Sequence, residues 1–570
     1  MRPRVGGRIG RLGQPLFALI LLLSACRPMV GRSGGIPSAT ADINLLASTT
    51  LTPFQPELNT PLPTVTAFTT LMEFTNTQAR TSLWISPAVP ESLQTLAVSS
   101  GLSRVTDQTS ASIRLDVSGS IDASTTWIYA LVAPFPTITD DVPLGTIQDG
   151  WAGKNPQFFA NHPLLMTDST LAAFSALWGN PADGSVNVVA AGNLVDSAWA
   201  NQPAWAIIPF EELEPRWKVI SVDGQSPIHN DFDPQVYPLK VSFALDPPAF
   251  QLPTTNRDPQ KLTVLAMTGV TALVRGTADR MEKHGVLYPG EAIRSVLRSA
   301  DLTHVSNEVS FYNGCPTPDP WTESLQFCSD PRYIALLEDM GVDIVELTGN
   351  HELDYGTTAM LTTLDMYDQR GWLHFGGGRN LADASNAVTV TQNGNKLAFL
   401  GCNPAGPPSD WATDSRPGSA PCDYGQIQAQ ISSLKAEGFL PIVTFQYNEY
   451  YQPEPTTREQ ADFRSMAEAG AVIVSGSQSH VPAAMEITGG TFIHYGLGNL
   501  FFDQMSYRLD DGSLIYTTRD VFVDRHIFYD GKYLGTELLT FIIEDYARPR
   551  PMTDQERSQF LKMIFAAAGW

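Results

Sequence analysis

Short apolar segments alternate with helix-like segments from residue 262 to residue 495, and this alternation constrains the fold more than any other feature. Strands are predicted at residues 262–267, 302–305, 343–347, 373–375, 441–445, 471–475 and 491–495. Helices are predicted at residues 289–299, 331–340, 357–370, 426–437 and 457–469, and residues 388–400 resemble a hairpin. Parallel strands need crossover connections, which are usually helical and right-handed. The pattern therefore predicts an α/β domain with a largely parallel sheet covered on both faces.

Polar residues follow five of these strands. In open α/β sheets, ligands bind at the carboxyl ends of the strands, so these residues should gather at one edge. The set consists of Glu308, Asn350, His351, Gln446, Glu449, Gln478, His480, Asn499 and Asp503. A single one of them could be an ordinary solvated loop residue, but five clusters together predict a polar binding or catalytic site.

Four segments in this region resemble the CapA family of poly-γ-glutamate capsule synthesis proteins, over about residues 260–505. They are ADLTHVSNEVSF at 300–311, TGNHELDYG at 348–356, the stretch 449–481 and FIHYGLGNLFFDQ at 492–504. The resemblance implies a metallophosphoesterase-like α/β sandwich. It also implies a role in making or handling a capsule polymer, with that polymer or its synthesis machinery as partner.

The same resemblance implies a site for divalent metal ions. The matched ligand positions are Glu308, Asn350, His351, Glu449 and His480. In an enzyme of this fold Glu308, Asn350 and His351 would be catalytic, with His351 as general acid or ligand and Glu308 as ligand or base.

Three further ligand positions of the family are occupied here by Val270, Phe445 and Gln478. Valine and phenylalanine cannot bind a metal, and a glutamine amide binds one more weakly than imidazole does. The sequence leaves two alternatives, a single ion on Glu308, His351 and His480, or no metal. Gln446, Gln478, Asn499 and Asp503 are expected to line the site.

The N-terminal 26 residues are typical of a bacterial lipoprotein signal peptide. Four arginines precede an apolar run, LFALILLL, which is too short to span a bilayer and ends in Leu-Ser-Ala-Cys26. We expect Cys26 to be lipidated and the protein to be anchored at the extracytoplasmic face of the cell membrane. Residues 27–74, rich in Ser, Thr and Pro, are predicted to form a stalk.

Export implies an oxidising environment, and four cysteines remain beyond Cys26. Local pairing of Cys315 with Cys328 and of Cys402 with Cys422 is preferred, because short loops cost little entropy to close.

The remaining chain is divided at a Pro-rich break. Residues 75–246 are predicted to be a smaller α/β accessory domain, 247–260 a linker, 261–545 the CapA-like domain and 546–570 a tail. The segment 205–224 loosely resembles phosphate-type periplasmic solute-binding proteins, and an accessory domain without a ligand is the alternative.

A formal net charge of −23 disfavours nucleic acid as a partner. Motifs of serine hydrolases, P-loop enzymes and HExxH metalloproteases are absent from the sequence. Three hypotheses remain. They are a CapA-type surface lipoprotein acting in capsule or exopolymer synthesis or attachment, a metal-dependent envelope hydrolase of an ester or amide, and a solute-binding or sensory lipoprotein. Whether the chain is an enzyme is left open.

Overall fold

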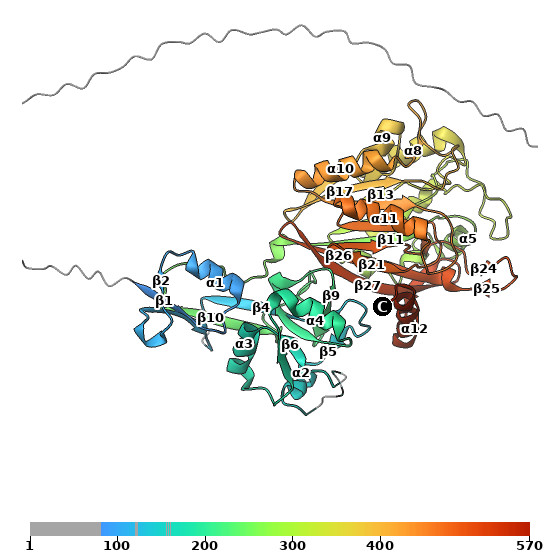
Figure 1. The fold of residues 1–570 in the computed structure, drawn as a ribbon. Coiled ribbons are helices and arrows are strands. Elements are labelled where there is room, and N and C mark those ends of the chain that lie inside the picture. The colour runs from blue at the N-terminus through green and yellow to red at the C-terminus, as the bar shows by residue number, and fades with distance from the viewer. Residues whose placement is uncertain (1–80, 120–122, 155–156, 158, 160) are drawn as a thin grey trace, which may run out of the picture. The chain divides into compact units, whose positions relative to one another are not determined.

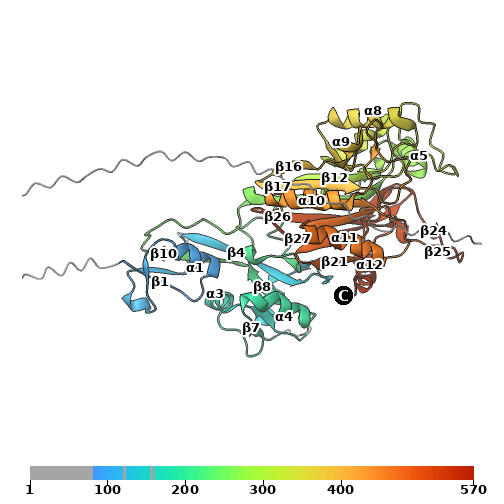
Figure 2. The ribbon, with the colours of Figure 1, turned by 45° about the horizontal axis from the view of Figure 1, so that its top comes forward.

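Two β-sheets lie face to face in the C-terminal part of the chain (Figures 1 and 2). The computed structural model describes residues 81–119, 123–154, 157, 159 and 161–570. The predicted signal peptide, Cys26 and the whole of the predicted stalk lie outside these residues. The described residues from 81 to 570 belong to one compact unit.

The first sheet of the sandwich has the order β14-β13-β12-β11-β26-β27-β28, and β23 also pairs with β11. Its strands are β11 (Leu262–Thr271), β12 (Leu302–Asn307), β13 (Ile344–Glu346), β14 (Leu373–Phe375), β23 (Asn499–Phe501), β26 (Asp520–Tyr529), β27 (Lys532–Glu544) and β28 (Arg548–Pro551). Strands β11 to β14 are parallel to their neighbours, as predicted, whereas β26 pairs with β11 antiparallel.

The second sheet has the order β16-β17-β19-β20-β22-β21. Its strands are β16 (Val388–Gln392), β17 (Asn395–Cys402), β19 (Leu440–Gln446), β20 (Ile473–Ser477), β21 (Met485–Thr488) and β22 (Thr491–His494). Two two-stranded ribbons complete the region, β15 (Gly377–Gly378) with β18 (Gly418–Ser419) and β24 (Tyr507–Arg508) with β25 (Leu514–Ile515). The predicted strands therefore belong to two sheets, and the expectation of a single sheet edge is corrected.

Helices cover the outer faces of the sandwich. They are α5 (Arg275–His284), α6 (Arg294–Leu297), α7 (Ile334–Met340), α8 (Gly356–Asp368), α9 (Leu381–Ser385), α10 (Tyr424–Ala436) and α11 (Thr457–Ala469). A further helix, α12 (Asp554–Ala567), follows β28. Helix α11 begins with a capping box in which Thr456 and Glu459 satisfy each other's backbone N–H groups, and ends at Gly470 with φ +115°. Such local signals explain why this helix was predicted with the right bounds.

Separate apolar clusters hold the layers together. One cluster lies between the sheets and includes Met267, Phe399, Ile442 and Phe522. A second joins the first sheet to α5, α7 and α8, and a third joins the second sheet to α10 and α11. The α/β sandwich implied by the resemblance is confirmed. Phe560 and Ile564 of α12, within the predicted tail, also pack into the inter-sheet cluster.

The preceding region is a smaller α/β unit built on one mixed sheet of order β2-β1-β3-β10-β4-β8-β6-β7, with β9 pairing to β4 and β5. Its strands are β1 (Ser82–Ile85), β2 (Ser103–Arg104), β3 (Ile113–Val117), β4 (Thr125–Pro134), β5 (Asp141–Val142), β6 (Leu164–Met166), β7 (Val186–Val188), β8 (Ala206–Pro209), β9 (Trp217–Val222) and β10 (Lys240–Asp246). Its helices are α1 (Glu91–Val98), α2 (Leu144–Trp151), α3 (Asp168–Trp178) and α4 (Leu194–Ala200). The predicted smaller α/β fold of this region is confirmed.

Both local disulfides are formed as predicted, Cys315–Cys328 and Cys402–Cys422. Within the described residues, no helix has the length and apolar character needed to span a membrane.

Candidate functional site

The ends of β12, β13 and β19 converge, so that side chains from both sheets meet. Gln446, at the end of β19, donates from Nε2 to Glu308 Oε1 (2.7 Å) and to Asn350 Oδ1 (3.3 Å). Gly349 makes this approach feasible, since a Cβ at this position would lie 2.7 Å from the Cα of Glu308. The glycine lets the loop after β13 pass directly beside the loop after β12.

His351 is oriented by Asp354, a residue of the TGNHELDYG segment that was not singled out as a site residue. His351 Nδ1 lies 2.8 Å from Asp354 Oδ2, which also accepts the backbone N–H of Phe327 at 2.7 Å. A carboxylate can only accept here, so Nδ1 carries the hydrogen and Nε2 keeps its lone pair. The imidazole packs 4.7 Å from the Phe327 ring and is 21% exposed, which leaves it accessible as a base or ligand.

His480 is the second histidine of the cluster and is almost fully buried. Its Nδ1 lies 2.8 Å from Asn499 Oδ1, while Asn499 Nδ2 donates to the backbone oxygens of His480 and Thr518. These two carbonyls fix the amide orientation, so His480 Nδ1 donates and Nε2 has the lone pair. Burial lowers the pKa of His480, which favours the neutral ring at neutral pH.

Glu449 and Gln478 form a linked pair at the rim of the cluster. Gln478 Nε2 donates to Glu449 Oε1 (2.8 Å), and Tyr451 donates to Glu449 Oε2 (2.8 Å). Gln478 has a left-handed backbone, with φ +79°, and only 4% of it is exposed. Its Oε1 is buried and accepts no hydrogen bond. A non-glycine residue in this conformation is uncommon and marks a position that the surrounding structure holds in place.

Glu308 is buried beside several other carboxyl groups. Burial first, and then the negative charges of Glu449, Glu352 and Glu346, hold the pKa of Glu308 well above its usual range. This shift favours the protonated form of the Glu308 carboxyl, which can donate a hydrogen bond as well as accept one.

A buried polar chain extends from the site into the sandwich, and sequence reasoning missed it. The Ser477 hydroxyl lies 2.9 Å from Gln446 Oε1 and 3.1 Å from Glu346 Oε1, and Glu346 lies 3.4 Å from His304 Nε2. Glu346 is the last residue of β13 and lies inside the predicted strand 343–347. The prediction considered only the residues that follow each strand. The available signal was a glutamate within an otherwise apolar strand, DIVEL.

Asp503 has a different role from the one expected. Its carboxylate accepts from Arg275 (2.6 Å) and from the backbone N–H of Gly276 (2.8 Å), and it makes no hydrogen bond to the other predicted site residues. It thus fixes the start of α5. The guanidinium of Arg275, which sequence reasoning also missed, lies 5.0 Å from the rings of both Phe327 and Phe502.

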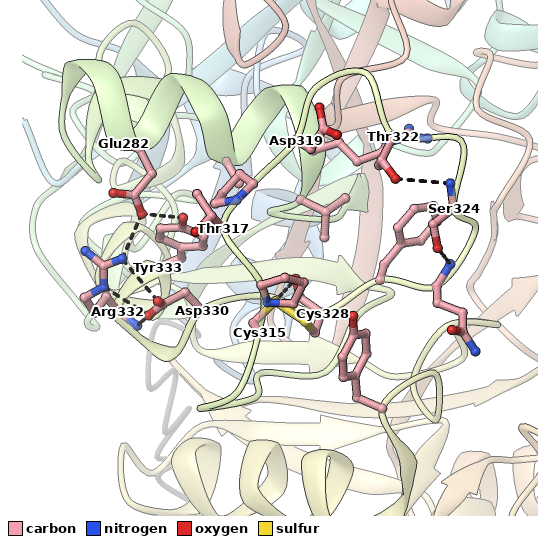
Figure 3. Close-up of a pocket in the computed structure, with 18 residues that line it drawn as sticks. Glu282, Cys315, Thr317, Asp319, Thr322, Ser324, Cys328, Asp330, Arg332 and Tyr333 are labelled. Carbon is pink, nitrogen blue, oxygen red and sulfur yellow. Dashed lines mark hydrogen bonds and ion pairs between the residues drawn. A yellow bond between two sulfur atoms is a disulfide. The ribbon is translucent and has the colours of Figure 1, made fainter.

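A cavity of about 510 Å³ lies beside the cluster, between α5 and the loop closed by Cys315–Cys328 (Figure 3). Arg275 and Phe327 belong to its lining. Arg332 and the hydroxyl of Tyr333 both donate to Glu282 on one side, and Asp319, Thr322 and Ser324 lie on the facing stretch of loop (Figure 3). The cavity is large enough for a segment of a polymer or a small ligand.

In the part of the chain that the structure describes, no group of three or more His, Cys, Asp or Glu side chains could hold a metal ion. Val270 and Phe445, which occupy ligand positions of the family, are fully buried in apolar clusters. Apart from Asp503, the predicted site residues make hydrogen bonds through amide or imidazole groups: Gln446 with Glu308 and Asn350, Gln478 with Glu449, His480 with Asn499, and His351 with Asp354.

Comparison with known proteins agrees with this region of the fold. The family described as "Bacterial capsule synthesis protein PGA_cap" matches residues 264–504. Over these residues the chain is similar to the CapA family, in agreement with the resemblance seen in the sequence. The matched region contains all five strand ends that form the site.

Two curated CapA relatives come from bacilli. The capsule biosynthesis protein CapA of Bacillus anthracis is 27% identical over 47% of this chain and 66% of its own length. The PGA biosynthesis protein CapA of Bacillus subtilis (strain 168) is 27% identical over 39% of this chain and 59% of its own length. The chain thus spans somewhat less than two thirds of the length of these relatives.

A solved 5'-nucleotidase precursor from Thermus thermophilus aligns over 54% of this chain and 58% of its own length, with 14% identity and a TM-score of 0.31.

Proposed function

We propose that this protein is a cell-surface lipoprotein of the CapA type that acts in the synthesis or attachment of a capsule or exopolymer resembling poly-γ-glutamate. The observation that carries this proposal is the family match over residues 264–504. Within it Gln446 bonds both Glu308 and Asn350, and the adjacent His351 bonds Asp354. The polymer, or the machinery that makes it, is the proposed partner.

The side chains of the site supply groups that such a polymer could engage. His351 offers Nε2 as a base or acceptor, and the raised pKa of Glu308 suits its carboxyl to hold a proton. The neighbouring cavity could hold the polymer residues that adjoin the group bound at the site. With a formal net charge of −23, the protein repels a polyanion at long range. Binding of such a polymer therefore depends on specific contacts at the site.

The second candidate is an envelope hydrolase acting on an ester or amide. The His351–Asp354 pair favours it, since an imidazole held by a carboxylate is suited to general acid–base catalysis. The proposed metal dependence of such a hydrolase has no support in the ligand geometry of the described residues.

The solute-binding hypothesis gains no support from the region before residue 247. A cavity of about 390 Å³ there is lined by Glu91, Glu212 and Glu214, together with Arg216, which is paired with Glu214 and Asp196. Burial, with the charges of Glu211 and Glu91, raises the pKa of Glu212 to about 7. An anion would meet repulsion in this cavity.

Replacing His351 by Ala in the bacterium that encodes the chain tests the proposal. We expect cell-associated polyglutamate, measured by amino-acid analysis after hydrolysis, to fall at least about tenfold, since loss of a general acid or base typically costs that much or more. The matched control is His162→Ala, an exposed histidine outside the site. Unchanged polymer in the His351 variant, at equal protein level, would contradict the proposal.

The anchor is tested separately. In Cys26→Ser cells, the protein should shift from the membrane fraction to the medium or the soluble extracytoplasmic fraction, and labelled fatty acid should no longer be incorporated. Retention of the label in this variant would rule out Cys26 as the lipidated residue.

A further inference from the structure

We infer that the amide groups of Gln446 and Gln478 take the place of cations in this site, and that the site binds an uncharged amide group of its polymer without a metal ion. This inference rests on the proposed function and specifies the chemical group that the site recognises. It also marks a disagreement between this chain and the metal centre that the family resemblance implied.

Gln446 Nε2 lies between two oxygens that match ligand positions, Glu308 Oε1 and Asn350 Oδ1. Both oxygens accept from this amide nitrogen, which occupies a position that a metal ion could otherwise fill. The amide NH₂ group supplies two hydrogens, one for each oxygen. Gln446 is fully buried, and its own oxygen lies within hydrogen-bond distance of Ser477, so its orientation is fixed on both sides.

Gln478 repeats this arrangement at Glu449. Its Nε2 donates to Glu449 Oε1, which matches another ligand position. An imidazole at position 478 would offer a lone pair to a metal, whereas the amide nitrogen offers only hydrogens. The two glutamines therefore direct N–H groups at the oxygens that would otherwise bind a metal ion.

The atoms that remain unpaired indicate the ligand. Gln478 Oε1 is buried and unpartnered, and an unpaired acceptor in a buried position is costly unless a ligand satisfies it. His351 Nε2 is a further acceptor, while Asn350 Nδ2 is a donor with no partner among the described residues. The site thus contains both unpaired acceptors and an unpaired donor.

An amide group matches this set and a phosphate does not. An amide has an N–H for Gln478 Oε1 or His351 Nε2 and a carbonyl for Asn350 Nδ2. A phosphate ester brings only acceptors and negative charge, and it would face the carboxylate of Glu449 with no bound cation between them. The amide bonds of a glutamate polymer, not its carboxylates, are the groups that this site fits.

The experiment uses the full-length protein in detergent and an uncharged probe, a γ-linked glutamate oligomer whose carboxyl groups are methyl esters. Isothermal titration is carried out with excess EDTA, with phenyl phosphate as the contrasting probe. We expect the oligomer to bind and phenyl phosphate not to bind. Gln478→Ala should weaken oligomer binding about tenfold, the cost of losing one hydrogen-bonding group at a buried site. Gln426→Ala, at an exposed position in the first turn of α10, should leave binding unchanged.

Metal content gives the second readout, which does not depend on ligand binding. After dialysis against Mn²⁺ and then buffer, the native chain should hold far less than one ion. A stoichiometric ion that is lost in His480→Ala would overturn the inference, as would oligomer binding that requires Mn²⁺ or is insensitive to Gln478→Ala.

These outcomes separate the inference from the proposed function. Loss of surface polymer in His351→Ala cells, combined with metal-dependent binding, would keep the function and reject the inference. Metal-free amide binding through Gln478, combined with an unchanged amount of polymer on His351→Ala cells, would keep the inference and reject the proposed function.

Discussion

Asp520 begins β26 with a carboxyl group that is largely buried and accepts no hydrogen bond from the described residues. Burial raises the pKa of Asp520 to about 7, with Glu556 adding to the shift and Arg519 opposing it. In the unfolded chain the carboxyl ionises near pH 4. Between these two values the folded state binds the additional proton, so folding becomes less favourable as the pH rises from about 4 to 7.

Asp520→Asn should remove this pH dependence. The amide is neutral at every pH, so we expect the variant to be more stable than the native chain above pH 7, by about 1–3 kcal/mol, and nearly equal to it at pH 4. Urea denaturation at pH 4, 6 and 8 measures the difference. Asp414→Asn, at an exposed position, serves as control. If the difference in free energy of unfolding between Asp520→Asn and the native chain were the same at all three pH values, Asp520 would not titrate as described.

Single residues of the site were predictable where they follow a strand, because the strand itself is visible in the sequence. Glu308, Asn350, His351, Gln446 and His480 all belong to this class. Glu346 was missed because it lies within a strand, and Arg275 because helix α5 was not predicted. The bond between Asp503 and Arg275 joins positions 228 residues apart, a pairing that no local pattern specifies.

The loop closed by Cys315–Cys328 is an element of the site as well as of the fold. It presents Phe327, whose ring packs on His351 and whose N–H holds Asp354. The second disulfide, Cys402–Cys422, closes a loop with a sequence separation of 20. Asp410 of this loop interacts electrostatically with Asp354 and His351, but it makes no hydrogen bond to the histidine.

We expect the two disulfides to be separable by mutation. Removing either pair by double Cys→Ser substitution should cost about 3 kcal/mol of stability, from the entropy regained by the unfolded chain. Only the Cys315→Ser, Cys328→Ser chain should also lose polymer binding, since only this loop orients His351 through Asp354. Denaturation and titration of both variants check this. Equal binding by the two variants would mean that Phe327 and Asp354 are held without the disulfide.

Most elements of residues 262–495 were predicted from periodicity and turn residues, with bounds within a few positions for most of them. The division into two sheets was not predicted, since it depends on which distant strands pair. β13 and β19 have similar apolar sequences, yet they belong to different sheets. The long strands β26 and β27 were also not predicted. They pair with each other directly, with no helix between them, and lie beyond the segment in which strands alternate with helices.

At the scale of the whole chain, an ionic cluster joins the smaller α/β region to the sandwich. Glu537 of β27 contacts His229 (3.1 Å) and Arg525 (3.1 Å). Burial alone would raise the pKa of Glu537, but the hydrogen bond from His229 and the charges of His229, Arg525 and Lys218 lower it to about 2. Its ionised form therefore stabilises the fold above the unfolded pKa near 4.5, and this contribution is lost as the pH falls from there towards 2.

Glu537→Gln should lower the stability of the protein by about 1–3 kcal/mol at pH 7, and the deficit should shrink as the pH is lowered from 4.5 to 2. Thermal denaturation across this range is the measurement. The exposed Glu468→Gln provides the comparison. A deficit that stays constant down to pH 2 would mean that the charge of Glu537 is not the stabilising feature.

Strand β26 pairs along its length with β11, although more than 250 residues separate Leu262 from its partner Tyr529. During synthesis from the N-terminus, most of β11 has no partner on this side until the residues of β26 have been made. An open strand edge at that stage invites pairing with other chains. Residues 520–529 therefore close the first sheet late in folding, and a product cut short before residue 520 would leave the edge of β11 open to association with other chains.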